Sequence, residues 1–290
     1  MPATRSRKIT RSQSAMEYLM TYGWAILIIA VVLGVLFQLG IFSGSSLTPK
    51  AQPGSCEVQR LLGQASLEGL CQGQLPQFVA QFSSSYIYLG QLPGFPTGKP
   101  VPQITFAAWI KTTTTSFESI EGLRGAAFEI GRSGQLFFHG CSPADEAINV
   151  NTNIDLSNGA WHFIALSYNY PGNSLIGFVD GYSANTAINP TEASISSPNT
   201  AMIGNDVCDS GPDFTGSMAD MQMYNASLSA NELQALYQEG IGGTPVRIQN
   251  LIGWWPLNGN ANDYSGNNNN GQINGQVSFN STWSSAYTAP

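Results

Sequence analysis

The residue whose position suggests the most specific chemistry is Glu17, an acid at the start of a long apolar segment. Within residues 24–42 the only clearly polar residue is Gln38. A carboxylate that enters an apolar bundle costs on the order of 2.5–3.5 kcal/mol at mid-membrane. A cation held in the correct axial register offsets this cost, so we expect Glu17 to specify helix assembly rather than to add much stability. The alternative is a glutamate at the membrane edge, solvated by lipid head groups.

The apolar segment that must position Glu17 is long enough to cross a membrane. As a helix, residues 24–42 would span about 28 Å, the thickness of a hydrocarbon core. Four basic residues precede the segment: Arg5, Arg7, Lys8 and Arg11. They favour a cytoplasmic N-terminus and export of the rest of the chain. A secretory signal has a shorter apolar core, although the small residues 43–46 would suit its cleavage. A plain membrane anchor fits the length but leaves Glu17 unexplained.

The segment RSQSAMEYLMTYG, residues 11–23, resembles the class III signal peptide of archaeal type IV pilin-like proteins. The resemblance implies that a prepilin peptidase cuts between Ser12 and Gln13, before the apolar helix, which stays in the mature protein. Glu17 is then the fifth mature residue, where that family carries a glutamate. Its implied role is to pair with the N-terminal amine of a neighbouring subunit, here that of Gln13. An archaellum filament is a further option, but the pair formed by Glu17 and Tyr18 and the large head favour a pilus-type fibre.

Composition indicates an extracellular β domain after this helix. Charged residues make up only 10% of the chain, whereas it holds 31 Gly and 16 Pro. Few charges and many turn-forming residues are typical of all-β domains. The net charge is −7 although the leader is basic, so the remainder is acidic. Nucleic acid is therefore excluded as a partner, because phosphate binding needs a basic surface.

The expected organisation has four parts. They are a leader that is removed (1–12), an assembly and transmembrane helix (13–42), a linker with a disulfide-clamped collar (43–75) and a β-sandwich head (76–290). Small residues and two prolines after residue 42 end the helix. Between Cys56 and Cys71 the leucine spacing predicts a short helical patch.

The four cysteines all follow the apolar segment: Cys56, Cys71, Cys141 and Cys208. The absence of a Cys-x-x-Cys pair and the presence of only two His argue against zinc. Four cysteines allow three pairings, of which we favour Cys56–Cys71 with Cys141–Cys208. The alternative is four buried free thiols, and the choice depends on the head lying outside the cell.

Short apolar or alternating stretches recur from residue 76 on, among them ITFAAWI (104–110), WHFIALSY (161–168) and MADMQMY (218–224). Their spacing predicts a β-sandwich. FAAWIKT, WHFIALSYN with IGFVDG, and FTGSMADMQMYNASLSANELQALY also resemble the laminin-G-like or concanavalin A-like lectin domain, over roughly residues 76–283. The implied fold class is a long N-terminal α-helix plus an all-β jelly-roll sandwich. Ser229 and Glu232 form a capping box for a short helix that ends at Gly240.

One segment departs from the pattern of that family. LIGWWPLNGNANDYSGNNNNG normally opens the domain, but here it occupies residues 251–271. Either the domain is circularly permuted and residues 251–280 close their own sandwich, or they complete the head of a neighbouring subunit. Closure within one chain is the default, because the termini of a β-sandwich are often close together.

The sequence requires no cofactor, and the only one that we consider is calcium, in an oxygen-rich loop. Asp263, Asn267 and Asn269 could ligate calcium through their side chains, and the related family often places calcium near such turns. The alternative is a polar Asn-Gly turn. A weaker second candidate is the group Asp206, Asp209 and Asp213 around Cys208.

No catalytic constellation is evident. The paired carboxylates of glycan hydrolases are missing, since Glu129 has no acidic neighbour in the sequence. Neither His139 nor His162 lies in a nucleophile motif. Asn225-Ala-Ser and Asn280-Ser-Thr are glycosylation sequons, and we expect at least one to be used.

The resemblances together imply a structural subunit of an archaeal type IV pilus-like filament, with helices as its core and lectin-like heads as its surface. Its expected partners are other copies in a helical homopolymer, prepilin peptidase and the membrane assembly machinery, with surface glycans as optional ligands for adhesion. Trp254, Trp255 and Trp283 are the candidates for stacking on sugars, and burial in the core is the alternative. The competing function is a membrane-anchored lectin-like surface protein that does not polymerise.

Overall fold

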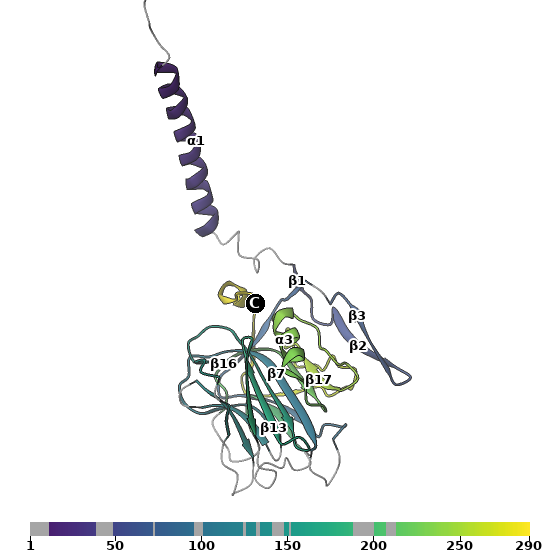
Figure 1. Cartoon of the computed structure of the whole chain (residues 1–290). Helices are drawn as coiled ribbons and strands as arrows, with labels where there is room; N and C mark the ends of the chain where they lie inside the picture. The colour runs from purple at the N-terminus through teal and green to yellow at the C-terminus, as the bar shows by residue number, and fades with distance from the viewer. Residues whose placement is uncertain are drawn as a thin grey trace, which may run out of the picture. The chain divides into compact units, whose positions relative to one another are not determined.

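The chain consists of two compact units, residues 1–47 and residues 48–290. The structure, a computed structural model, describes residues 12–38, 49–71, 73–95, 101–123, 126–131, 134–140, 148–150, 152–187, 200–206 and 213–290. The first unit contains helix α1 (Ser12–Gln38), and the second contains the β-sandwich (Figure 1).

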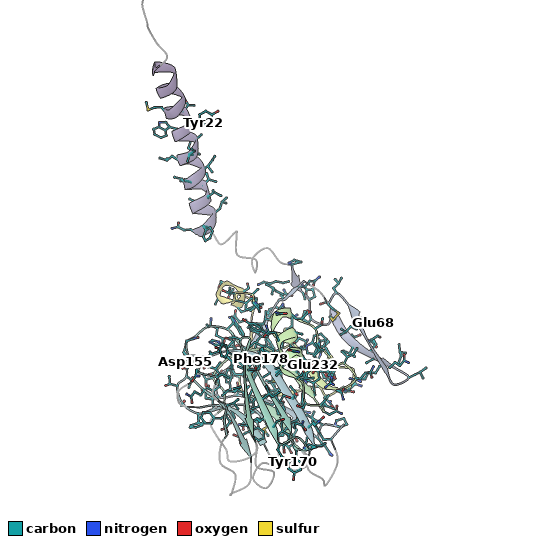
Figure 2. All side chains as sticks on the ribbon, in the orientation of Figure 1. Tyr22, Glu68, Asp155, Tyr170, Phe178 and Glu232 are labelled. Carbon is teal, nitrogen blue, oxygen red and sulfur yellow. A yellow bond between two sulfur atoms is a disulfide. The ribbon has the colours of Figure 1, made fainter. Side chains whose placement is uncertain are left out.

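Helix α1 is unbroken over its 27 residues, as the sequence predicts for this stretch. Met20–Gln38 forms a segment long and apolar enough to cross a membrane. Its large side chains point to all sides and are exposed, from Met20 to Phe37 (Figure 2). A helix that is apolar all round is stable only when lipid or other apolar helices surround it. Residues 39–42 of the predicted helix lie outside the described residues.

The described strands of the second unit form two large sheets and two small ones. One large sheet has the order β11-β10-β9-β8-β15-β6-β18, and the other β14-β13-β12-β7-β16-β5-β19, with β17 also beside β16. The first sheet contains β6 (Tyr86–Gly90), β8 (Glu118–Leu123), β9 (Ala126–Ile130), β10 (Leu136–Gly140), β11 (Ile148–Val150), β15 (Ala201–Ile203) and β18 (Gln272–Asn274). The second contains β5 (Val79–Phe82), β7 (Gln103–Lys111), β12 (His162–Asn169), β13 (Ser174–Val179), β14 (Tyr182–Ala187), β16 (Gly216–Tyr224), β17 (Leu251–Trp255) and β19 (Ser278–Asn280).

Hydrophobic side chains cover both faces of the second sheet. In β12, Ile164 and Leu166 face the core between the sheets, whereas Phe163 and Ala165 face the other side. Helix α3 (Ala230–Glu239) and the 3-10 turn η1 (Trp283–Ala286) contribute to the cluster on that other side. This double burial explains why residues 163–166 of β12 form a continuous apolar run instead of alternating with polar residues.

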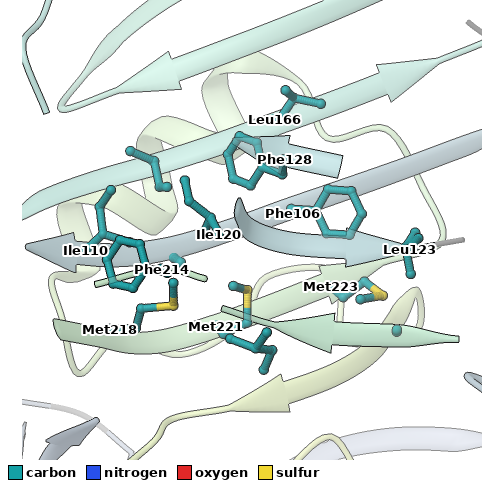
Figure 3. Close-up of a cluster of buried hydrophobic side chains, with 14 of the residues drawn as sticks. Phe106, Ile110, Ile120, Leu123, Phe128, Leu166, Phe214, Met218, Met221 and Met223 are labelled. Carbon is teal, nitrogen blue, oxygen red and sulfur yellow. The ribbon is translucent and has the colours of Figure 1, made fainter. Parts of the chain in front are cut away.

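The core between the sheets is closed by contacts across them. Phe106 of β7 stacks on Phe128 of β9, with ring centroids 6.1 Å apart. Met218, Met221 and Met223 of β16 lie beside them (Figure 3). A bulge between Ala219 and Gln222 inserts an extra residue, so all three methionines face the core despite their uneven spacing.

Helix α3 has the ends that the sequence predicts. The Ser229 side chain accepts the backbone N–H of Glu232, and the Glu232 carboxylate accepts the backbone N–H of Ser229. Gly240 ends the helix with φ +78°, a conformation that favours glycine. The predicted capping box is therefore confirmed.

The collar between Cys56 and Cys71 is a β-hairpin, so the prediction of a helical patch was wrong. Strand β2 (Cys56–Leu61) pairs antiparallel with β3 (Gln64–Gly69). Leu62 and Gly63 both have positive φ and form the two-residue turn, which a helix would not allow. The leucines are exposed rather than packed on one face. The small pair β1 (Lys50–Ala51) and β4 (Leu75–Pro76) joins the two ends of the collar.

The C-terminal segment pairs with strands of its own chain. Strand β17 runs antiparallel to β16, β18 to β6, and β19 to β5. Of the two arrangements that the sequence left open, this is closure within one chain. Strand β19 also brings the end of the domain beside β5, one of its first strands.

Candidate functional site

The predicted calcium loop is held together by its own hydrogen bonds, with Asp263 at the centre. Its Oδ1 accepts the backbone N–H groups of Trp254 (2.9 Å) and Ser265 (2.8 Å). Its Oδ2 accepts the Ser265 hydroxyl and the Asn269 backbone N–H, each at 2.9 Å. Four donors thus occupy the four lone-pair positions of the carboxylate.

Asn267 and Asn269 turn their amide nitrogens, not their oxygens, toward strand β17. Asn267 Nδ2 donates to the carbonyls of Leu251 (2.8 Å) and Ile252 (2.9 Å), and Asn269 Nδ2 donates to that of Ile252 (2.8 Å). A calcium ion needs six to eight oxygen ligands, and these groups are engaged with the protein. The geometry therefore fits a structural loop and does not fit a cation, so the calcium hypothesis stays a prediction without support.

The second acidic group is also tied into the fold where it is described. Ser119 Oγ donates to Asp206 Oδ2, and Asn205 Nδ2 donates to Asp213 Oδ1. Asp209 and Cys208 lie outside the described residues. Among the described residues, no three His, Cys, Asp or Glu side chains are grouped as metal ligands would be.

Beside the loop that contains Asp263 lies a pocket that the sequence does not predict. It lies between the collar, the turn after α3 and strand β17, and it encloses about 490 Å³, including the space open to solvent. Its apolar wall includes Ile241, Pro256, Trp254 and the Cys56–Cys71 disulfide. The only ionisable carboxylate that lines it is Asp220.

The bulge of β16 places Asp220 at this pocket. Asp220 has φ +50° and is 5% exposed. Its Oδ1 accepts the indole N–H of Trp254 (2.7 Å), and its Oδ2 accepts the amide of Gln222 (3.0 Å). The Tyr224 hydroxyl donates to Gln222 Oε1, which fixes the orientation of that amide. Four side chains therefore form one buried hydrogen-bonded chain in which Gln222 and Trp254 both donate to Asp220.

Burial raises the pKa of Asp220 to about 7, although the hydrogen bonds from Trp254 and Gln222 lower it. The negative charge of Glu239 raises it further. Charge removed from water is costly without a counter-charge, and both hydrogen-bond donors to Asp220 are neutral. A perturbed acid that lines a pocket is a candidate for binding or chemistry.

The three tryptophans considered for sugar stacking are buried. Trp254, Trp255 and Trp283 are 4%, 0% and 4% exposed. Trp255 Nε1 donates to the Asn269 carbonyl (2.9 Å), and Trp283 Nε1 donates to that of Pro76 (3.2 Å). They hold the fold and cannot offer a ring face to a sugar at the surface. Among the described residues of the head, Tyr182 is the aromatic residue whose side chain is exposed.

The collar disulfide between Cys56 and Cys71 is present, as predicted, and its two cysteines are 15 positions apart in the sequence. The second predicted bridge, Cys141–Cys208, lies outside the described residues. Strand β2 docks onto β17 and the segments on either side of it. Val58 N–H donates to the Tyr264 carbonyl, and Arg60 donates to the carbonyls of Ser265, Ile248 and Leu251. The collar is therefore part of the sandwich unit.

The two sequons differ in their surroundings. Asn225 Oδ1 accepts the Asn250 amide (3.0 Å), in a half-buried position. Asn280 ends the edge strand β19, and its Oδ1 accepts both the backbone N–H and the hydroxyl of Thr282. The predicted cleavage residues Ser12 and Gln13 and the predicted assembly residues Gln13 and Glu17 are in the helical backbone of α1, and their side chains lie outside the described part.

Comparisons with known proteins place the head in a family. Residues 83–234 match the concanavalin A-like lectin/glucanases superfamily. A candidate carbohydrate-binding protein from Bacteroides ovatus has a similar fold, with 19% identity and a TM-score of 0.56. The alignment covers 75% of this chain and 66% of that one, slightly under two thirds.

A heptameric SAP-like pentraxin from Limulus polyphemus is similar as well, with 13% identity and a TM-score of 0.53 over 70% of this chain and 94% of that one. Likeness at such low identity shows the fold alone. No curated protein matches the chain in sequence. Since the family match spans more than half of the chain, the protein belongs to the concanavalin A-like lectin/glucanases superfamily, with an apolar helix ahead of its lectin-like domain.

Proposed function

We propose that this chain is a structural subunit of an extracellular, archaeal type IV pilus-like filament. The N-terminal helices form the filament core, and the lectin-like heads form its surface. The observation that carries the proposal is α1, an unbroken helix whose exposed apolar side chains point to all sides. Such a helix needs apolar neighbours everywhere, which lipid supplies in the precursor and other copies supply in a filament.

Assembly requires processing before the helix. Prepilin peptidase cuts between Ser12 and Gln13, and the membrane assembly machinery then extracts the subunit. The new amine of Gln13 pairs with Glu17 of a neighbour, which fixes the axial register because a misplaced acid stays unpaired among apolar side chains. The resemblance of residues 11–23 to a class III signal peptide and the position of Glu17 support this step.

The test is the variant Glu17→Ala, expressed from the native locus. Electron microscopy of sheared cell surfaces should show at least about tenfold fewer filaments. Without the Glu17 carboxylate, the amine of Gln13 stays unpaired among apolar side chains, which costs on the order of a few kcal/mol per subunit. Glu17→Gln separates charge from size, and it should also lose filaments. Glu57→Ala removes an exposed carboxylate from the head and is the matched control.

Filaments at the normal level in Glu17→Ala would favour the alternative, a membrane-anchored lectin-like protein that does not polymerise. Mass spectrometry of the N-terminus separates the same two functions. A chain that begins at Gln13 supports the filament, and one that begins at Met1 supports the plain anchor. A chain that begins after Phe42 contradicts both.

The head contributes adhesion through glycan binding. The family of the domain supports this part, and we assign no catalytic role to the head. A glycan array probed with the full chain in detergent should show binding above background. An array without signal removes adhesion and leaves filament assembly as it stands. In the cell-surface protein we expect a glycan on Asn280 rather than on Asn225, which intact-peptide mass spectrometry would locate.

A further inference from the structure

The pocket at Asp220 has the features of a binding site for a small ligand. The space within it that water-sized groups can occupy is about 50 Å³, which is room for a few such groups. Its walls are mainly apolar, and one buried carboxylate and the amide side chains of Gln52, Gln74 and Asn258 supply the polar contacts. Apolar walls with a few fixed polar groups are typical of ligand sites rather than of packing defects.

The pocket holds one carboxylate and lacks a positive charge to balance it. None of the residues that line it is Lys, Arg or His. The hydrogen-bond donors to Asp220, from Trp254 and Gln222, are neutral, and Glu239 adds a repulsive charge. Tyr224, at the far end of the chain of hydrogen bonds, is also neutral at physiological pH because burial raises its pKa. Among the groups that face it, the Asp220 carboxylate has no counter-charge.

The backbone at Asp220 is held in a conformation that side chains rarely adopt. Its φ of +50° lies in the left-handed region, and the bulge that produces it directs the carboxylate to the pocket side of β16. Such a conformation costs on the order of 1–3 kcal/mol and persists where the surroundings fix it. The fold thus retains both a strained residue and an uncompensated acid at one pocket.

We propose that this pocket binds a primary ammonium group on a small organic stem, with the nitrogen at the Asp220 carboxylate. The stem lies against Tyr264 and the Cys56–Cys71 disulfide, which line the same pocket. An amino sugar and a lysine side chain both present this group. The proposal does not depend on filament assembly.

Calorimetric titration of the full chain in detergent micelles tests the proposal with n-butylamine. The matched neutral probe is n-butanol, which has nearly the same size without the charge. We expect n-butylamine to bind at least about tenfold more tightly at pH 8, since an ion pair in a desolvated site is worth over 1.4 kcal/mol. Equal binding of both probes would mean that the pocket is merely apolar, and it would overturn the proposal.

The pH dependence gives a second readout on the unmodified protein. The amine stays protonated below about pH 10. Affinity should therefore fall about tenfold per pH unit below about pH 7, as Asp220 takes up a proton. The Trp254 indole N–H signal in NMR spectra should shift on titration with n-butylamine, because that group donates to Asp220. An affinity independent of pH from 5 to 8, or an unmoved Trp254 signal, would contradict the site.

Variants and paired ligands complete the experiment. Asp220→Asn keeps the shape and removes the charge, so it should lose the preference for n-butylamine. Glu68→Gln, on the exposed hairpin, is the control and should retain it. Glucosamine against N-acetylglucosamine, and Nα-acetyllysine amide against its Nε-acetylated form, distinguish the two sources of the ammonium group. Should Asp220→Asn fail to fold, the pH series and the NMR signal on the native chain still decide the matter.

Discussion

The carboxylates of Asp263, in the loop after β17, and of Glu121, in strand β8, differ in the number of hydrogen-bond donors around them. Asp263 receives four hydrogen bonds from the backbone and side chains around it. Glu121 is 1% exposed, and neither of its carboxyl oxygens has a hydrogen-bond partner among the described residues. Its cross-strand neighbours, Phe128 and Ile203, both belong to the apolar core.

The comparison teaches that burial alone does not decide what an acid contributes to stability. Donors that replace water satisfy the hydrogen-bonding capacity of a carboxylate and make it a structural centre. Without donors the acid is favoured in its neutral form, and burial raises the pKa of Glu121 well above its usual value. Asp220 lies between these extremes, with two neutral donors and no counter-charge.

The largest effect is expected from Asp263→Ala. Removal of the carboxylate leaves four donors unsatisfied, so the free energy of unfolding should fall by about 4 kcal/mol. Urea denaturation followed by tryptophan fluorescence measures the change. Asp155→Ala is the matched control, because exposed Asp155 also accepts two hydrogen bonds from Ser157. A loss in Asp263→Ala no greater than in the control would remove the structural role of the loop.

A stabilising change is expected from Glu121→Met. Replacement of an unpaired buried carboxyl by an apolar side chain of similar length should raise the free energy of unfolding by about 2 kcal/mol at pH 7. The folded-state pKa lies above the unfolded value of 4.5, so the native protein loses stability as the pH rises from that value. The advantage of Glu121→Met should therefore shrink toward pH 4.

Thermal melts of both proteins between pH 4 and pH 8 check this prediction. Glu121→Gln removes the charge but keeps an unsatisfied polar group, so it should gain less than Glu121→Met. A variant less stable than the native chain at pH 7 would show that Glu121 has a partner in the folded protein.

The last effect concerns Asp220 and is spread over a range of pH, so it appears as a slope. Its pKa rises from 3.8 to about 7 on folding, so the native chain loses stability as the pH rises through this window. A single proton gives a slope of at most about 1.4 kcal/mol per pH unit. In Asp220→Asn the contribution of this residue to the slope should vanish. Identical pH profiles for the variant and the native protein would mean that Asp220 titrates normally.

The parts of the fold that local chemistry determines could be predicted from the sequence. The capping box at Ser229 is a signal contained within four neighbouring residues, and the apolar run of α1 needs no tertiary contact to be recognised. The hairpin between Cys56 and Cys71 was missed because leucines at helical spacing outweighed the turn at Leu62 and Gly63. Leu62 is fully exposed at that turn, where the hydrophobic pattern carries no information.

The candidate site was harder to predict because it depends on a change of strand register. Asp220 reads as one polar residue in the alternating stretch MADMQMY, and only the bulge places it at the pocket. A faint signal was available, since the uneven spacing of Met218, Met221 and Met223 breaks strict alternation. The pocket itself joins residues about 200 positions apart, which sequence spacing does not reveal.

The two ends of the lectin-like domain meet at one place. Lys50 Nζ donates to the Ser281 carbonyl (2.8 Å), and the same ammonium lies 6.0 Å from the ring centre of Trp283. A domain that begins and finishes at one point can be exchanged by recombination as a cassette without disturbing the segment before it. The same N-terminal helix can therefore be joined to different domains of this kind during evolution without any change in its own sequence.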